Sequence, residues 1–178
     1  MKIKALMLIL FIGLSCLVIS GCANHDEVAD HGEVVDHGEV VDHGEGKELL
    51  RTNAEQGDPV AQRQLGIIYA SGQGVPLDHN EARKWIHLSA EQGDPVAQSY
   101  LGEFYARGIG VPQDYEKAIK WLRLSAEQGY AAAQFYMGHL YADGMGVSKD
   151  NDEAIKWFRL AAEQGDATAQ RRLKMIQK

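Results

Sequence analysis

Ala54-Glu55-Gln56-Gly57 is the stretch of sequence that decides the fold, because the same four residues return three times at a constant interval. They recur at positions 90–93, 126–129 and 162–165, so each step along the chain is 36 residues. Other residues keep the same register, including all 3 tryptophans. Self-similarity at a fixed interval of this length is typical of a repeat protein, in which each unit is one supersecondary element.

The first half of each unit has the pattern of an amphipathic helix. In the first unit Ala61, Leu65 and Tyr69 fall at i, i+4 and i+8, which is one face of a helix over about residues 59–70. Gly66 and its counterparts in the later units lie beside that face. Because glycine has no side chain, we expect a second helix to approach closely there.

The second half of each unit predicts that second helix. The loop Gly72-Gln-Gly74-Val has the pattern Gly-x-Gly-Val, which is present in all three units, and its first glycine suits a left-handed helix cap. Asp78 can then cap the second helix, whose inward face we expect to hold Ala82, Trp85 and the pair Leu88–Ser89. One hairpin cannot bury both apolar faces, so neighbouring units must stack into an all-α solenoid of helix-turn-helix hairpins.

These repeated residues resemble the Sel1-like repeat family, a relative of the tetratricopeptide repeats. The family pattern runs alanine, Leu-Gly-x-x-Tyr, Gly-x-Gly-Val, Asp, Ala, Trp and Ala-x-x-Gly, and three complete units carry it. The resemblance covers about residues 48–178 and implies a right-handed α-solenoid that binds other proteins. A disulfide-rich branch of the family is associated with penicillin binding and β-lactam hydrolysis. Its repeats carry cysteine pairs that this chain lacks, so we do not expect a cell-wall or β-lactam enzyme.

The N-terminal 21 residues are typical of a lipoprotein signal peptide. Two lysines precede an apolar stretch over residues 5–19, which is short for a membrane-spanning helix. The stretch ends in Ile19-Ser20-Gly21-Cys22, which resembles the bacterial lipobox, so we expect Cys22 to carry the acyl chains, palmitate among them. Ala23 favours the outer membrane and a periplasm-facing protein. An ordinary cleaved signal and an uncleaved anchor are the alternatives.

Residues 22–46 are predicted to form a disordered acidic tether. They hold eight acidic residues and no lysine or arginine, and the hexad Glu-Val-Val-Asp-His-Gly recurs in them with a period that fits neither helix nor strand. Imidazole beside carboxylate suits Zn²⁺, Ni²⁺ or Cu²⁺, so His31, His37 and His43 are weak candidate metal ligands. A metal-buffering lipoprotein is therefore an alternative function, although a simple spacer is the interpretation we favour.

The domain boundaries follow from these patterns. We predict a signal peptide at 1–21, the tether at 22–46 and the solenoid at 47–178. Within the solenoid we expect a degenerate N-terminal cap at 47–58, full units at about 59–94, 95–130 and 131–166, and a C-terminal half unit at 167–178.

Charge and isolated polar residues argue against several function classes. Residues 47–178 hold 16 basic and 17 acidic residues without a basic stripe, so nucleic acid is not an expected partner. The glycine loops lack the lysine and preceding strand of a phosphate cradle. His79, His87 and His139 are single histidines in different units, so we predict no catalytic residues, no cofactor and no metal site in the solenoid.

A binding surface is predicted where the units differ from one another. On a helical wheel, five positions of the first helix lie away from Leu65, and four of them vary in chemistry among the units. In tetratricopeptide-like solenoids the first helix lines the concave face, so the resemblance implies a groove for a protein or peptide. An envelope adaptor and a toxin-immunity lipoprotein both fit, and an ordinary solvated face is the alternative. The predicted groove residues are Tyr100, Glu103, Arg107, Phe135, Tyr136, His139 and Asp143.

Overall fold

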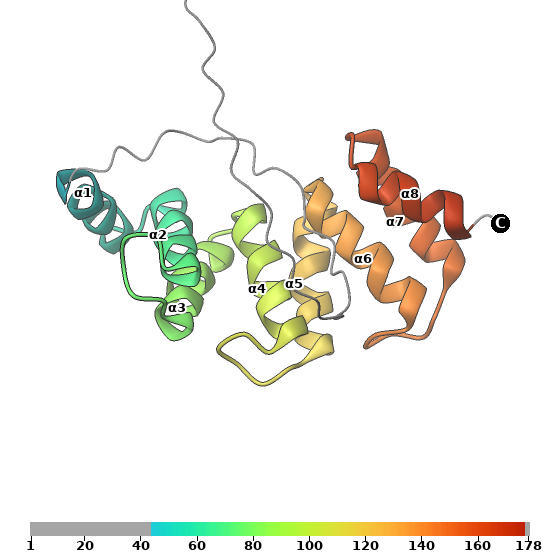
Figure 1. Ribbon diagram of the computed structural model, residues 1–178, viewed down its shortest axis with the longest axis horizontal. Coiled ribbons are helices and arrows are strands. Elements are labelled where there is room, and N and C mark those ends of the chain that lie inside the picture. The colour runs from blue at the N-terminus through green and yellow to red at the C-terminus, as the bar shows by residue number, and fades with distance from the viewer. Residues whose placement is uncertain (1–43, 177–178) are drawn as a thin grey trace, which may run out of the picture. The chain divides into compact units, whose positions relative to one another are not determined.

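The computed structural model describes residues 44–176, and these form eight α-helices with no strand among them. The helices follow one another in chain order from α1 at one end to α8 at the other (Figure 1). They are α1 (Gly44–Glu55), α2 (Pro59–Ser71), α3 (His79–Glu91), α4 (Pro95–Arg107), α5 (Tyr115–Glu127), α6 (Ala131–Asp143), α7 (Asn151–Glu163) and α8 (Ala167–Ile176). The first helices of the units, α2, α4, α6 and α8, are called A helices here, and α1, α3, α5 and α7 are called B helices. The prediction of an all-α solenoid of stacked hairpins is confirmed.

The N-terminal boundary of the solenoid differs slightly from the prediction. Helix α1 begins at Gly44, so residues 44–46 are helical and do not belong to a tether. Helix α1 takes the place of a B helix, because its Ala54 is buried as Ala90 is one unit later. The predicted signal peptide and the rest of the tether lie outside the described residues.

The two helices of each hairpin approach closely at the repeated glycine of the A helix. A Cβ atom added to Gly66 would lie 2.6 Å from the Ile86 side chain, and one added to Gly102 would lie 2.5 Å from Leu122. Carbon atoms cannot come that close without displacement, so a side chain at either position would push the B helix away. The predicted role of these glycines is confirmed.

The inward face of the B helices matches the prediction at Ala82, Trp85 and Ser89, which are buried, but not at Leu88. Ile86, Leu122 and Phe158 are fully buried, whereas Leu88, Leu124 and Leu160 are 38–42% exposed. Helices α3, α5 and α7 are each turned so that the residue after the tryptophan faces the A helix of the same hairpin. Among the tryptophans only Trp85 is buried. Trp121 occupies the same position in the next unit, so the repeat predicts that it is buried too, but it is half-buried.

A ladder of buried glutamines joins successive units. The Gln98 amide donates to the Ala90 carbonyl at 3.2 Å, and its side-chain oxygen accepts a hydrogen bond from Gln128 at 2.7 Å. Gln62 and Gln134 repeat both bonds one unit earlier and one unit later. Buried amides need such partners, so the ladder fixes the register in which neighbouring hairpins stack.

Candidate functional site

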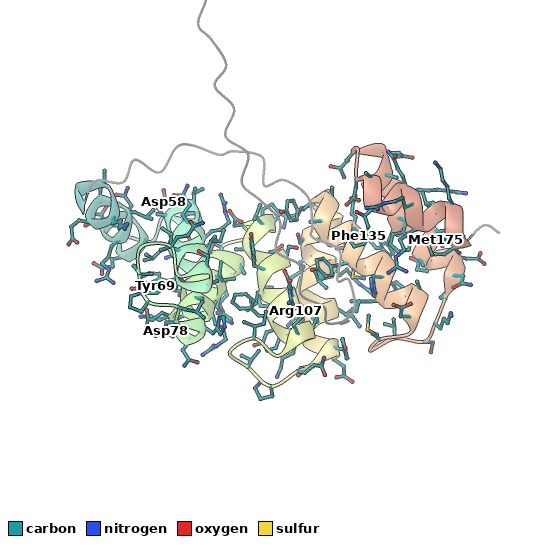
Figure 2. All side chains as sticks on the ribbon, viewed as in Figure 1. Asp58, Tyr69, Asp78, Arg107, Phe135 and Met175 are labelled. Carbon is teal, nitrogen blue, oxygen red and sulfur yellow. The ribbon has the colours of Figure 1, made fainter. Side chains whose placement is uncertain are left out.

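The predicted groove residues lie on the neighbouring A helices α4 and α6. Figure 2 labels Arg107 on α4 and Phe135 on α6. Glycine caps with a positive φ end both helices, at Gly108 and Gly144, and these caps set the direction in which each helix leaves the loop. We call the half-buried and exposed side chains at the predicted groove positions of α4 and α6 the A face. Its residues are Tyr100, Glu103, Arg107, Tyr136, His139 and Asp143.

A charged pair on α4 lies at the middle of the A face. The Arg107 guanidinium donates to the Glu103 carboxylate at 2.6 Å, one helical turn away. The side chain of Glu103 is 20% exposed and that of Arg107 is 59% exposed, so the arginine is the member that a partner would reach first. The hydrogen bond to Glu103 raises the pKa of Arg107, which therefore stays charged.

Tyrosines from α4 and α6 lie beside this pair. The Tyr136 hydroxyl on α6 is hydrogen-bonded to Glu103 on α4, and burial followed by the charge of Glu103 raises the pKa of its phenol. Burial also raises the pKa of Tyr100 on α4, and the Glu103 charge adds to that shift. Both phenols are therefore neutral at physiological pH, and they offer aromatic surface together with hydroxyl groups.

The variable positions contact one another in a regular way. His139 on α6 lies 3.5 Å from the Arg172 guanidinium on α8, a separation of 33 residues. Tyr136 and Glu103 have the same separation along the chain. A residue near the middle of one A helix therefore contacts a residue about one turn further along in the preceding A helix. Each contact fixes a side chain that an isolated helix would leave free to rotate.

His139 also lies near Asp143, one helical turn later. Its Nδ1 atom is 3.0 Å from the Asp143 carboxylate, but the ring N–H direction does not meet hydrogen-bond geometry. The contact therefore depends on charge, and it becomes an ion pair only when the imidazole is protonated. Asp143 is the exposed member of this pair, in the same way that Arg107 is on α4.

Phe135 does not belong to the A face, and its assignment to the groove was wrong. Its side chain is 3% exposed, and its ring lies 5.6 Å from the ring of Phe158. Ala154, Ala161 and Ala169 complete the same buried cluster. The helical wheel placed this residue opposite the core, but the A helix of the following unit covers that side.

Tyr130 is a residue of the site that the sequence reasoning missed. It stands at the N-cap of α6, where α2 and α4 have Asp58 and Asp94, and it makes no capping hydrogen bond. Burial raises the pKa of its phenol, and the electrostatic interaction with Tyr100 is the second cause of that rise. The two tyrosines therefore lie near each other. The available signal was its departure from the repeat, because aspartate stands at this position in every other unit.

The B helices α3 and α5 carry open depressions on their own exposed side. One is lined by residues of α3 that include Lys84, His87 and Leu88, and another by residues of α5 that include Lys120 and Leu124. Both are open to solvent, and neither contains residues of the A face. They are the structural alternative to the A face as a docking surface.

The remaining predicted sites are not covered by the described residues. Cys22 and the candidate ligands His31, His37 and His43 lie outside them, so lipidation and weak metal binding stay predictions. Within residues 44–176 there is no group of three histidine, cysteine or acidic residues placed to hold a metal ion. No helix in that part of the chain has the length and apolar character needed to cross a membrane.

Comparison with known proteins identifies similar chains. The model for the Sel1 repeat matches residues 59–94, 95–130 and 131–166. A Sel1 repeat protein from Oxalobacter formigenes is 38% identical over 71% of this chain and 96% of that protein, with a TM-score of 0.65. The protective antigen c5321 of uropathogenic Escherichia coli strains, which displays an SLR fold, is 41% identical over 74% of this chain, with a TM-score of 0.72.

Two further comparisons show how much of each relative is similar to this chain. The chain spans only 28% of the length of the c5321 antigen. Cysteine rich protein B of Helicobacter pylori shares the fold alone, at 20% identity over 69% of this chain and 93% of that protein, with a TM-score of 0.56. None of the curated proteins matches the chain.

Proposed function

The chain belongs to the Sel1 repeat family, whose members act as protein–protein interaction scaffolds, and on that premise we propose that it is a membrane-anchored scaffold that binds a protein or peptide in the periplasm. The observation that carries the proposal is the A face. The positions that pack the two helices of a hairpin together at the repeated glycine vary only among apolar residues, at Ile86, Leu122 and Phe158, whereas the A-face positions change in charge and polarity from unit to unit. Such a difference is expected where a surface is specific for a partner.

The chemistry of the A face supports binding. Tyrosine and arginine are the residues that most often contribute large binding energies at protein interfaces. Here Tyr100 and Tyr136 are half-buried, and Arg107 is held against Glu103. A side chain that is already fixed loses little conformational entropy when a partner binds, so more of its contact energy contributes to affinity.

The anchor part of the proposal rests on the N-terminal sequence. Ile19-Ser20-Gly21-Cys22 follows two lysines and an apolar stretch, as in a lipoprotein signal. Acyl chains on Cys22 would bury enough CH₂ groups, at about 0.8 kcal/mol each, to hold the protein on a membrane. Ala23 after the cysteine supports the outer membrane and a periplasm-facing solenoid.

A matched pair of arginine variants tests the proposal. Cross-linking in the native envelope first identifies a captured protein, and a binding isotherm is then measured with that protein purified. Arg107→Ala on the A face should weaken binding about 5- to 30-fold, which corresponds to about 1–2 kcal/mol. Arg159→Ala, an exposed change on B helix α7, should leave the affinity unchanged. Both variants should melt within about 0.5 kcal/mol of the parent protein.

The proposal fails if the two substitutions have the opposite effects on binding affinity. Normal binding by Arg107→Ala together with weak binding by Arg159→Ala would place the partner on the B helices. Tyr100→Ala provides a second change on the A face, so a loss that appears in both A-face variants cannot be attributed to arginine chemistry alone.

A further inference from the structure

The two ends of the described solenoid expose opposite halves of a hairpin. Helix α1 is a B helix that has no A helix before it, and α8 is an A helix that has no B helix after it among residues 44–176. Both ends expose large apolar side chains, with Leu49 of α1 62% exposed and Met175 of α8 67% exposed (Figure 2 labels Met175). Exposed apolar surface of this kind favours burial against a matching partner.

The α1 helix of a second copy has the residues needed to pair with α8. In the first unit Gln92, just after B helix α3, donates to Gln62 of A helix α2 at 2.8 Å. The equivalent residues at the two ends are Gln56, just after α1, and Gln170, on α8. Leu50 of α1 similarly stands at the position of the buried Ile86. A second copy could therefore extend the glutamine ladder and the apolar contact of each hairpin.

One residue at the end of the solenoid opposes this pairing. Lys174 of α8 stands where the other A helices have Gly66, Gly102 and Gly138. A Cβ atom added to any of these glycines would lie 2.5–2.7 Å from the B-helix residue that faces it. In an end-to-end stack the facing residue would be Leu50 of the second copy, so the Cβ of Lys174 would collide with it.

We propose that Lys174 is a stop residue, which prevents the α1 helix of a second copy from docking on α8. An end-to-end contact of this kind joins two different surfaces, so it would not close into a dimer but would grow into chains. A residue that blocks an unwanted continuation of a repeat disfavours alternative assemblies. A single position thereby keeps a self-complementary solenoid from polymerising.

Two substitutions at Lys174 separate steric blocking from charge. Lys174→Gly removes the Cβ atom, whereas Lys174→Ala removes the charge and the long side chain but keeps that atom. The full chain in detergent is examined by sedimentation over a range of protein concentrations. The parent protein and Lys174→Ala should show one mass at all concentrations. Lys174→Gly should show at least a doubling of weight-average mass that increases with concentration.

A second site shows which surface the growth uses. Leu49 is exposed in the parent protein, so Leu49→Glu leaves the core of α1 unchanged while it places a charge on the surface that would face α8. Adding it to Lys174→Gly should return the mass to that of the parent. Circular dichroism confirms that each variant remains helical. The proposal is overturned if folded Lys174→Gly does not grow, if Lys174→Ala grows equally, or if growth persists with Leu49→Glu.

Discussion

Two leucines in helix α5 should respond very differently to the same substitution. Leu122 is fully buried, and its side chain fills the space beside Gly102 on α4. Leu124 lies two residues further on and is 40% exposed. The pair therefore compares one chemical change in two environments within a single helix, so differences in helix propensity cancel.

The structure determines how much each substitution should lower the free energy of unfolding. Leu122→Ala leaves a cavity that Gly102 cannot fill, because glycine has no side chain, so it should cost about 3–4 kcal/mol within the usual 2–5 kcal/mol range. Full burial of a leucine is worth about 1.5–3 kcal/mol, and Leu124 has only part of that burial to lose. Leu124→Ala should therefore cost about 1 kcal/mol.

Urea unfolding followed by circular dichroism at 222 nm measures both values. The midpoint should shift strongly for Leu122→Ala and weakly for Leu124→Ala, with similar slopes for both. An equal or larger loss for Leu124→Ala would refute the assignment of the B-helix faces. It would instead support the inward face that the sequence alone predicted, which contained the position of Leu88.

Three further outcomes are expected. Radiolabelled palmitate should enter the parent protein and not Cys22→Ala, and equal labelling of both would contradict lipidation at this residue. Gln98→Leu removes a buried member of the ladder and should cost about 1–3 kcal/mol in a melt, whereas Gln170→Leu, at an exposed position, should cost no more than about 0.5 kcal/mol. The raised pKa of Tyr136 delays its ionisation beyond the ordinary value of about 10, so the stability it contributes is complete below that pH and is lost as pH rises through the folded-state pKa. The difference between the absorbance titrations of the parent protein and Tyr136→Phe gives the pKa of the Tyr136 phenol. An ordinary pKa for that phenol would contradict the prediction.

Features that depend on backbone geometry could be predicted from the sequence. The glycine caps, the aspartate caps of the B helices and the close approach at Gly102 each require one residue type at one position, and that requirement is visible as identity between units. The repeat interval and the stacking of hairpins follow from the same identities. These elements were therefore predicted with their correct positions.

Packing between units was harder to predict, because a helical wheel treats each helix in isolation. The position of Leu122 is isoleucine or phenylalanine in other units, so its variation hid a core position, while the invariant leucine two residues later appeared to be core. Phe135 looked exposed because the wheel omits the neighbouring A helix. The glutamine ladder was missed for the same reason, since its partners lie in different units.

The candidate site was predicted only in part. Tyr100, Glu103, Arg107 and Tyr136 do lie together, because comparison of units finds variable positions on one helix face. Tyr130 lies in the turn before α6, outside the face that was compared. The contacts that hold these side chains connect different A helices, and no single-helix pattern contains them.

Site-specific photo-cross-linking in the native envelope tests the proposed binding surface most directly. A photoreactive amino acid is placed at Arg107 on the A face in one protein and at Leu124 on the exposed side of a B helix in another. The Arg107 probe should give a protein adduct of constant mass, and the Leu124 probe should not give that adduct. An adduct from Leu124 with none from Arg107 would contradict binding through the A helices.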